Sequence, residues 1–360
     1  MQFGKFNITI FLLAILLTFL GLISIYSSKG FSFFLHQSIF IGIGIVLLFV
    51  LSRLDYRIFR DNSYLLLTLY FLFIILLFVL LFLPAHREVK SWYRFGSFSF
   101  NPSEFTKIIL ILLLAKYFSK RHVELYRSFH IFVSLIYTLI PVFLIYLQPD
   151  LGSAIVFLVI WFGILFVSGI RLRHFIILML FGGLIAFLSW QFLLADYQKE
   201  RIKSFIQPNY KPLEIGWNQR QAKIAIGEGG FLGQGFKKGS QIQKGFLPEP
   251  HTDFIFSAIA EEFGLIGSGM VLILSSFLIY LILRVGISAK DNFARLFAIG
   301  YALLLFSHLL INLGANIGFL PIIGIPLPFV SYGGSFLISC FIGLGIIESI
   351  IIHSPKLKES

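Results

Sequence analysis

The sequence is poor in cysteine and in charge. Its single cysteine, Cys340, lies in an apolar run. One cysteine cannot form an intramolecular disulfide, and it says nothing of the redox compartment. Only 13% of the residues are charged, whereas 58% are hydrophobic and 44 are phenylalanine. Soluble domains are roughly 45–50% apolar, and no soluble core could bury so much more apolar surface. The composition therefore predicts an all-α polytopic membrane protein.

Acidic residues are scarce, with 17 against 29 basic ones and a net charge of +12. In a membrane protein this excess indicates topology rather than a nucleic-acid partner, because basic residues collect in the loops. We therefore expect the chain to sit in a lipid bilayer and to bind no nucleic acid.

Several common motifs are missing. The apolar stretch Phe11–Ile25 follows only Lys5 and precedes no small-x-small cleavage site, so we expect a retained span and not a signal peptide. The segment GEGGFLGQGFKKGS at 227–240 lacks Walker spacing, which argues against nucleotide binding. Its glycines fit turns or a close approach of backbone to a ligand. No internal repeat or linker is visible, so we expect one domain over residues 1–360.

Apolar stretches near the ~20 residues that a bilayer requires predict about ten transmembrane helices. The predicted spans are Ile8–Tyr26, Phe34–Ser52, Tyr64–Leu83, Ser103–Phe118, Phe129–Leu147, Leu151–Ser168, Phe175–Leu194, Phe254–Leu283, Leu296–Asn316 and Pro328–Ile352. The eighth is long, and we expect it to tilt or break near Gly264 and Gly267.

The basic residues predict the orientation. With the N-terminus inside, the cytoplasmic segments hold fifteen Lys and Arg residues, and the short outer loops hold four: Lys29, Arg87, Lys90 and Arg94. The large outer loop, about 195–252, holds nine, but long loops cross the membrane largely regardless of charge. We therefore predict that both termini are cytoplasmic.

That outer loop, between the seventh and eighth spans, is the one stretch that resembles a soluble protein. Asp196–Ile206 is predicted to be a short charged helix that ends before Pro208. Trp217–Ile226 is amphipathic enough to lie on the membrane surface, with Trp217 as an interfacial anchor.

The segment Gly239–Gly267 closes this loop and enters the eighth span. Asp253 lies where the loop meets the apolar helix, with His251 two residues before it and Glu261 about two turns further in. An ionisable residue at such a depth is costly and is a candidate functional residue. The alternative, given even odds on position alone, is that Thr252 or Asp253 only caps the helix.

A second polar cluster runs from Trp92 to Lys107. Asn101, with a proline after it and Glu104 three residues on, predicts a helix start with a capping box. Lys107 lies a turn inside the membrane and shares a helix face with Glu104. The two side chains either form a salt bridge with each other or line a polar cavity.

Two further clusters lie on the predicted outer side. Gln148–Ser153 makes a tight turn in which Asp150 is more readily a helix cap than a catalyst. Asn316–Ser335 carries three prolines and paired glycines, and predicts an irregular, re-entrant segment of the kind tolerated where it lines a cavity or is buried in protein. Four clusters on one leaflet indicate a site that faces outward.

Four stretches in these clusters, QPDLGS, NPSEFTK, LPEPHTDFIFSAIAEEFG and GIPLPFVSYGGS, resemble the signature segments of the SEDS family of bacterial cell-wall polymerases. The matching topology covers essentially the whole chain, and GSQIQKGFLPE resembles the elongation branch more than the division branch. Three positions depart from the family pattern: Asn101 stands for a usual Gln, Tyr93 for Ile and Phe336 for Ser.

The resemblance implies a peptidoglycan glycosyltransferase in the bacterial cytoplasmic membrane. Such an enzyme joins lipid II units into glycan strands outside the membrane, beside a class B penicillin-binding protein and the elongation machinery. Carried over by motif, Asp253 is the catalytic residue, and Glu104, Lys107 and Trp92 belong to the substrate site.

The residue chemistry agrees with that activity. A positioned carboxylate can take the proton of an acceptor sugar hydroxyl, and burial would raise its pKa toward that use. The leaving group is a lipid diphosphate, so cations must face it: Lys107, Arg220 and Lys223 are candidates, with a divalent cation such as Mg²⁺ or Mn²⁺ as a further one. His251 and Glu261 complete the candidate substrate-binding residues.

Two rival functions come from other classes. A lipid II flippase or transporter would use the intramembrane charges as a polar path, but these gather near one face and no inverted repeat is visible. A scaffold for cell-shape proteins would need no chemistry at all.

Overall fold

The computed structural model describes residues 4–83, 90–96, 98–120, 128–194, 196–207 and 216–354. Within them, eight helices are long and apolar enough to cross a membrane. They are α1 (Ile8–Lys29), α2 (Phe31–Arg53), α4 (Ser63–Leu80), α6 (Ser128–Leu147), α8 (Leu172–Leu188, continued by a π-helical turn Ser189–Leu193), α12 (Ile255–Ser288), α13 (Asn292–Ile317) and α14 (Gly334–His353). With α5 (Pro102–Ser119) and α7 (Leu151–Val167), these helices occupy all ten predicted spans. The all-α polytopic fold is confirmed.

The remaining elements are short. They are α3 (Arg57–Asp61), the strands β1 (Tyr93–Phe95) and β2 (Phe98–Phe100), α9 (Asp196–Ile206), α10 (Trp217–Gly229) and α11 (Ser240–Gln243). The two strands form an antiparallel hairpin in which Tyr93 faces Phe100, a feature that the sequence did not predict. The predicted short helix at 196–206 is confirmed.

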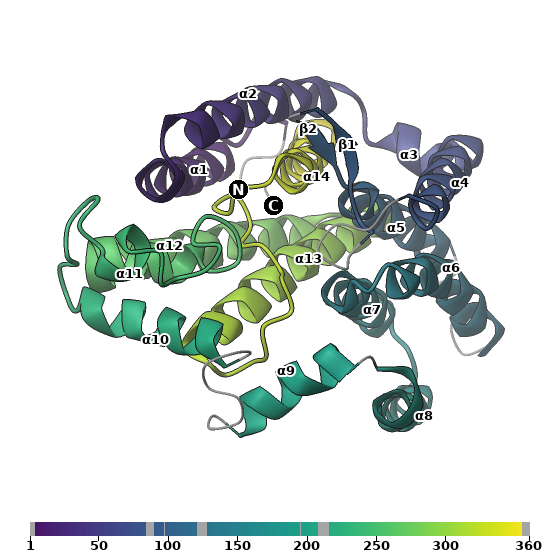
Figure 1. Ribbon diagram of the computed structural model, residues 1–360. Helices are drawn as coiled ribbons and strands as arrows, with labels where there is room; N and C mark the ends of the chain where they lie inside the picture. Colours follow the sequence, from purple (N-terminus) through teal and green to yellow (C-terminus); the bar gives the residue numbers. More distant parts are fainter. Residues whose placement is uncertain are drawn as a thin grey trace.

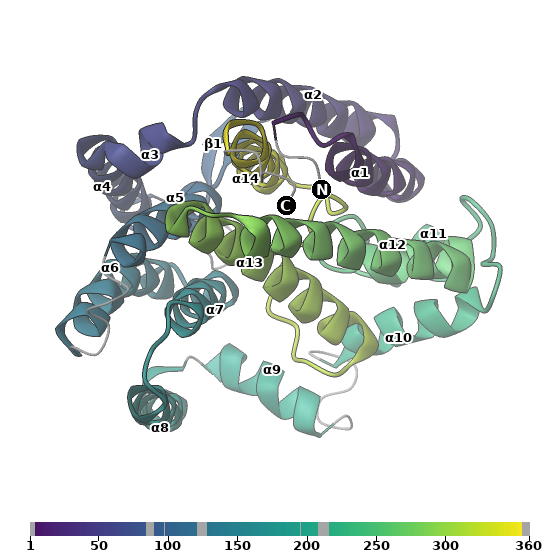
Figure 2. The same ribbon diagram turned by 180° about the vertical axis from the view of Figure 1, so that it is seen from behind.

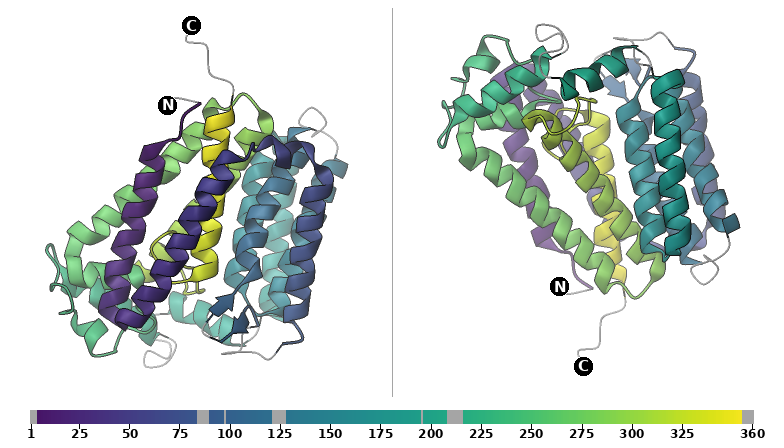
Figure 3. Two further views of the ribbon diagram at one scale, coloured as in Figure 1. Left: turned by 90° about the horizontal axis from the view of Figure 1, so that it is seen from above. Right: turned by 90° about the horizontal axis from the view of Figure 1, so that it is seen from below.

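The spanning helices lie side by side as one bundle (Figure 1). Both termini emerge at one end, and α9, α10 and α11 cover the opposite end (Figure 3). α13 lies at the centre and packs against α5, α7, α10 and α12. α8 stands at the edge, as the view from behind shows (Figure 2), and none of its described residues is buried. The interior of the bundle is therefore built around α13.

Two helix starts near the outer end carry side-chain caps, but the capping box predicted for α5 is wrong: Asn101 N donates to Ser335 Oγ at 2.9 Å, and the Glu104 carboxylate binds Lys107 instead. The Asn101 side chain accepts a hydrogen bond from Ser103 N at 3.0 Å, with Pro102 as the first residue of α5. The Asp150 side chain accepts one from Ser153 N at 3.0 Å at the start of α7. Each cap satisfies an N–H that a helix start leaves free, so the prediction that Asp150 is a cap is confirmed.

α12 breaks at Gly264, as its length and glycines predicted. Gly264 has φ 63° and ψ −155°, and a Cβ there would lie 2.4 Å from Gly233 N. The kink brings the glycine-rich segment of the outer loop against the helix, where Leu265 N donates to Gly230 O at 2.9 Å. Only glycine tolerates both the dihedral angles and the close approach.

α10 is the helix that the sequence predicts as amphipathic, and one of its faces packs against protein. Ala222 and Ala225 on this helix are fully buried and pack with Phe254 and Ala258 at the start of α12. Small side chains allow this close contact. The face of α10 that carries these alanines is therefore covered by protein, and the position of the helix on the membrane surface stays a prediction.

The prediction that the tenth span begins at Pro328 is wrong, because α14 begins at Gly334. Leu327 N donates to Ser331 Oγ at 2.8 Å, and Ser331 Oγ donates to Thr252 O at 2.7 Å. Phe329 has φ 62°, outside the helical range. Side-chain hydrogen bonds to the backbone thus replace helix in this segment, as expected of an irregular segment buried in protein.

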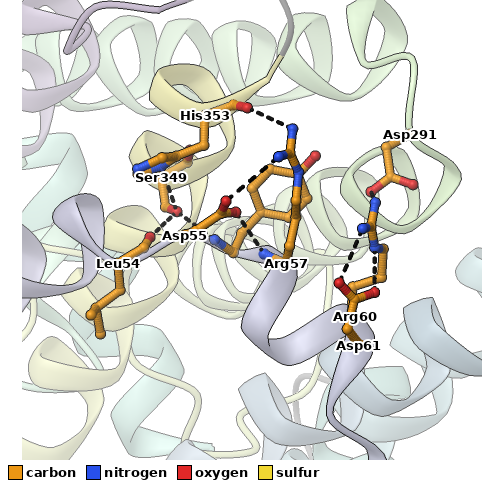
Figure 4. Close-up of polar contacts among 9 residues, drawn as sticks. Leu54, Asp55, Arg57, Arg60, Asp61, Asp291, Ser349 and His353 are labelled. Carbon is orange, nitrogen blue, oxygen red and sulfur yellow. Dashed lines mark hydrogen bonds and ion pairs between the residues drawn. The ribbon is translucent and has the colours of Figure 1, made fainter.

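At the end of the bundle that carries both termini, polar contacts join α3 to its neighbours (Figure 4). Arg57 Nη2 donates to His353 O at the end of α14 at 3.1 Å. Arg60 Nη1 lies 3.5 Å from Asp291 Oδ2 in the turn between α12 and α13. Because these side chains are partly exposed, the pairs add little stability, but they mark the end remote from the outer loop.

Candidate functional site

Asp253 lies in the turn that leads into α12, and its side chain does not cap the helix. The N-cap residue is Phe254, which has no side-chain cap, and Thr252 Oγ1 donates to Glu249 O at 3.4 Å. Among the described residues the Asp253 carboxylate has no hydrogen-bond or salt-bridge partner. The alternative of a mere cap is therefore wrong for both residues, and the carboxylate is left available.

Two asparagines on α13 hold the backbone of Asp253. Its carbonyl oxygen accepts from Asn312 Nδ2 at 3.0 Å and from Asn316 Nδ2 at 2.9 Å. Asn316 Oδ1 in turn accepts from Ser257 N and Oγ, which fixes the orientation of the amide. Both asparagines are buried, so these bonds are shielded from water.

The two residues before Asp253 are held from the segment that precedes α14. His251 O accepts from Tyr332 N at 2.8 Å, and Thr252 O accepts from Ser331 Oγ at 2.7 Å. Three successive carbonyl groups thus have partners on other elements. The backbone of the turn is fixed while its acidic side chain is not engaged.

The surroundings of Asp253 favour its protonated form. The carboxylate is half-buried, and its pKa is raised to about 6, mainly by burial and then by the negative charge of Glu249. Asp150 adds to the shift, while the positive charge of Arg201 on α9 opposes it. A carboxyl group with such a pKa is a competent general base near neutral pH.

The irregular segment 318–327 passes directly beside this carboxylate. A Cβ on Gly324 would lie 3.8 Å from Asp253 Oδ2. Arg201 Nη1 also contacts this segment and donates to Ile322 O at 3.3 Å. The sequence predicted both the segment and the helix that carries Arg201, but not this residue, because nothing local distinguishes it from the other basic residues of α9.

Glu104 and Lys107 form a salt bridge, one of the two predicted alternatives. Lys107 Nζ lies 3.0 Å from Glu104 Oε1 and 2.9 Å from Oε2, and both residues are buried. The ammonium also lies 3.3 Å from Nε2 of His308 on α13. A buried pair of this kind is costly to break from either side.

Sequence reasoning missed a polar stripe on α13 made of His308, Asn312 and Asn316. The three residues recur at four-residue spacing, so they lie on one face of the helix. Such a stripe in an otherwise apolar span is a signal that could have been recognised from the sequence. The stripe contacts both the buried ion pair and the turn that carries Asp253.

The predicted cations of the outer loop lie on α10. Arg220 and Lys223 are both exposed there. The end of the Lys223 side chain lies against Gly318, where it occupies the space that a Cβ would need. Gln219, next to Arg220, donates to the carbonyls that flank this glycine, Ala315 O and Leu320 O. α10 thus packs beside the segment that passes Asp253.

Glu261 is engaged by the outer loop. Its carboxylate accepts from Gln241 N at 2.6 Å and from Ile242 N at 3.3 Å, and so caps the short helix α11. Its neighbour Glu262 accepts from Lys237 N at 3.1 Å and from the hydroxyl of Ser27 on α1. The two carboxylates fasten the loop to the kink of α12, and substrate binding by Glu261 stays a prediction.

The other two predicted residues take different positions. His251 is buried, with its ring 5.3 Å from that of Phe33 and 5.5 Å from that of Tyr332, centroid to centroid. Trp92 precedes β1 and is 40% exposed. His251 thus packs among aromatic rings in the turn, whereas Trp92 presents an open ring, and substrate binding by either residue stays a prediction.

For a metal, the described ranges offer no group of three or more His, Cys, Asp or Glu side chains placed to hold an ion. The acidic residues near Asp253, Glu249 and Asp150, act on it through their charges. A divalent cation at the site stays a prediction.

Comparison with known proteins identifies the family of this chain. The model of a family described as cell cycle protein, which covers FtsW, RodA and SpoVE, matches residues 7–356. The chain belongs to this FtsW/RodA/SpoVE family. The resemblance to SEDS proteins is thus confirmed.

Curated relatives within the FtsW/RodA/SpoVE family are similar over most of their length. Peptidoglycan glycosyltransferase MrdB of Escherichia coli K12 is 37% identical over 324 residues, which cover 89% of this chain and 86% of that protein. Stage V sporulation protein E of Bacillus subtilis 168 is 33% identical over 362 residues and 97% of each chain.

Solved structures agree with the fold. A chain from a study of structural coordination of polymerization and crosslinking by a peptidoglycan synthase complex matches with a TM-score of 0.84 and 30% identity, and covers 96% of this chain and 98% of that one. The rod shape determining protein RodA of Thermus thermophilus matches with a TM-score of 0.72 and 28% identity, over 96% and 97%. This member of the FtsW/RodA/SpoVE family is therefore a multi-pass protein of the bacterial inner membrane.

Proposed function

We propose that this chain is a peptidoglycan glycosyltransferase that polymerises lipid II into glycan strands on the outer face of the cytoplasmic membrane, for cell elongation and shape. The observation that carries the proposal is the Asp253 carboxylate, which is half-buried and has no described partner, in a turn whose three carbonyls are all held. The activity named for the Escherichia coli relative supports it.

In the proposed reaction Asp253 is the general base. The acceptor sugar hydroxyl loses its proton to the carboxylate as its oxygen attacks the anomeric carbon of the donor. The new C–O bond forms while the bond from that carbon to the diphosphate oxygen breaks, and the electron pair leaves with the lipid diphosphate. The fixed turn keeps the base in one place, which lowers the entropic cost of reaching the transition state.

The negative charge that develops on the diphosphate requires cations. We assign this function to Arg220 and Lys223 on α10, which are exposed, and add Arg201, whose charge reaches Asp253. Lys107 is a less direct candidate, because Glu104 and His308 already surround its ammonium. It would then shape the site rather than meet the leaving group.

We further propose that both termini are cytoplasmic and that the chain acts as one transmembrane domain with an outer loop at about 195–252. A class B penicillin-binding protein and the elongation machinery are the proposed partners. The structural neighbour from a peptidoglycan synthase complex, in which polymerization and crosslinking are coordinated, supports a transpeptidase partner.

The orientation is tested by labelling single cysteines in intact cells with an impermeant thiol reagent. Lys238 and Lys120 are both exposed and lie at opposite ends of the bundle, so exposure alone cannot separate them. We expect a cysteine at Lys238 to react and one at Lys120 to be protected. Cys340 is buried, and a Cys340→Ala background removes its residual signal. The reverse pattern would contradict the orientation.

The pH dependence of polymerisation tests the assignment of Asp253. Because its pKa is raised to about 6, the base form is depleted as the pH falls through 6, and turnover should drop about tenfold per unit below that value. An ordinary aspartate near 3.9 would leave turnover flat between pH 7 and 5. Initial rates with purified protein in detergent or nanodiscs decide between the two profiles, provided the fold is intact across the range.

A further inference from the structure

The ammonium group of Lys107 has partners on two elements. Both oxygens of the Glu104 carboxylate lie within hydrogen-bond distance of it, at 3.0 and 2.9 Å, and Nε2 of His308 lies 3.3 Å away. The other ring nitrogen, Nδ1, lies 3.1 Å from Pro326 O in the irregular segment before α14. His308 is fully buried, so neither nitrogen has water as an alternative partner.

These two partners fix the tautomer of His308. A carbonyl oxygen can only accept a hydrogen bond, so Nδ1 must carry the proton that it shares with Pro326. An ammonium can only donate, so Nε2 must be unprotonated to accept from Lys107. Both contacts require the same neutral Nδ1–H form, and a doubly protonated ring would turn an N–H toward the ammonium.

The ring is also held in its plane. His308 stacks on Phe336 of α14 with centroids 4.5 Å apart and planes 15° from parallel. The phenylalanine supplies an apolar face of matching size. Stacking and two hydrogen bonds together leave the imidazole one orientation.

One turn further along α13, Asn312 binds both the irregular segment and the turn that carries Asp253. Its Nδ2 donates to Ile325 O at 2.8 Å and to Asp253 O at 3.0 Å. Residues 325 and 326 are therefore tethered by Asn312 and His308 respectively, four residues apart on one helix face. The segment tethered in this way is the same one that passes Asp253 at Gly324.

We propose that His308 is a positioning residue, fixed as the neutral Nδ1–H tautomer, that holds the Lys107 ammonium and ties the Glu104–Lys107 pair to the segment beside Asp253. The expected effect of His308 on turnover rests on the proposed function. Its tautomer rests on the geometry alone. The imidazole does not touch the reacting atoms. It sets where the ion pair and the segment lie relative to the base.

Polymerisation by three variants at or beside this position tests the kinetic part. His308→Gln keeps one acceptor and one donor and should retain activity within about twofold, whereas His308→Leu keeps volume but neither group and should lose on the order of tenfold in turnover. Ser307→Ala is the matched control, because that hydroxyl bonds only to Leu304 O of its own helix. Equal loss in the Gln and Leu variants, or none in either, would overturn the proposal.

A background that lacks the ion pair separates positioning from simple packing. If His308 acts in part through Lys107, then His308→Leu should cost clearly less than tenfold in a Glu104→Gln, Lys107→Met protein, where only the tether to Pro326 O remains to be lost. A packing role predicts the same tenfold loss in both backgrounds. Inactivity of the wild type itself would instead count against the glycosyltransferase proposal.

The tautomer is measured without any substrate. Solid-state ¹⁵N NMR of histidine-labelled protein in bilayers, with His308→Gln as the difference sample, should show one ring with Nδ1 protonated and Nε2 unprotonated at neutral pH. An Nε2–H tautomer or a doubly protonated ring would overturn the proposal whatever the activity data show.

Discussion

Replacing Asp253 by asparagine should lower the rate of glycan chain formation at least ~10²-fold, within the usual range for the loss of acid–base catalysis. The substitution keeps size and leaves the backbone carbonyl on Asn312 and Asn316, because these bonds do not involve the side chain. Since the carboxylate has no partner among the described residues, removing its charge breaks no described contact. Binding of lipid II and folding should therefore survive.

The measurement is polymerisation of lipid II by purified proteins, with the fold checked by thermal unfolding. Asp61→Asn is the matched control, because it makes the same chemical change on α3 at the far end of the bundle, where Asp61 pairs with its neighbour Arg60. Near-normal polymerisation by a well-folded Asp253→Asn protein would remove Asp253 as the base.

The second large effect is expected at the buried ion pair. Lys107→Met leaves the Glu104 carboxylate buried without its cation, and Glu104→Gln leaves the ammonium without its anion. Breaking a buried pair from one side costs about 3–5 kcal/mol, so each single variant should unfold at markedly lower temperature and polymerise poorly. The double variant removes both charges and should cost less than the sum of the singles.

Thermal unfolding and polymerisation rates of the wild type, both singles and the double form one thermodynamic cycle. Strict additivity in either quantity would show that the two residues act independently, against the 2.9 Å contact seen here. An exposed pair, Arg60 with Asp61, provides the comparison, since its coupling should be below about 1 kcal/mol.

The helices were the predictable part of this fold. Each span is an apolar run of about the length that a bilayer requires, and the signal is local to the run. The start of α14 was missed because Leu327 N donates to Ser331 Oγ, and Ser331 Oγ donates to Thr252 O, which lies 79 residues away along the chain. The β1–β2 hairpin escaped because three-residue strands carry almost no periodic signal.

For the site, the sequence pointed to the Asp253 carboxylate but did not show whether this carboxylate caps the helix or is left without a partner. Whether Asp253 caps α12 depends on the backbone geometry of one turn, and that turn is set by hydrogen bonds from α13 and from Ser331 and Tyr332. The contact of Lys107 with His308 joins residues 201 positions apart, so no local pattern reveals it. Glu261 was placed in the substrate site by its depth, while its backbone partners in α11 could be seen only in three dimensions.

The central claim is tested most directly by reconstituting the purified protein into vesicles with labelled lipid II and following both products. We predict a ladder of glycan chains of increasing length, formed without a transpeptidase and absent with Asp253→Asn. Transfer of intact lipid II across the bilayer with no ladder would contradict the account and favour a flippase.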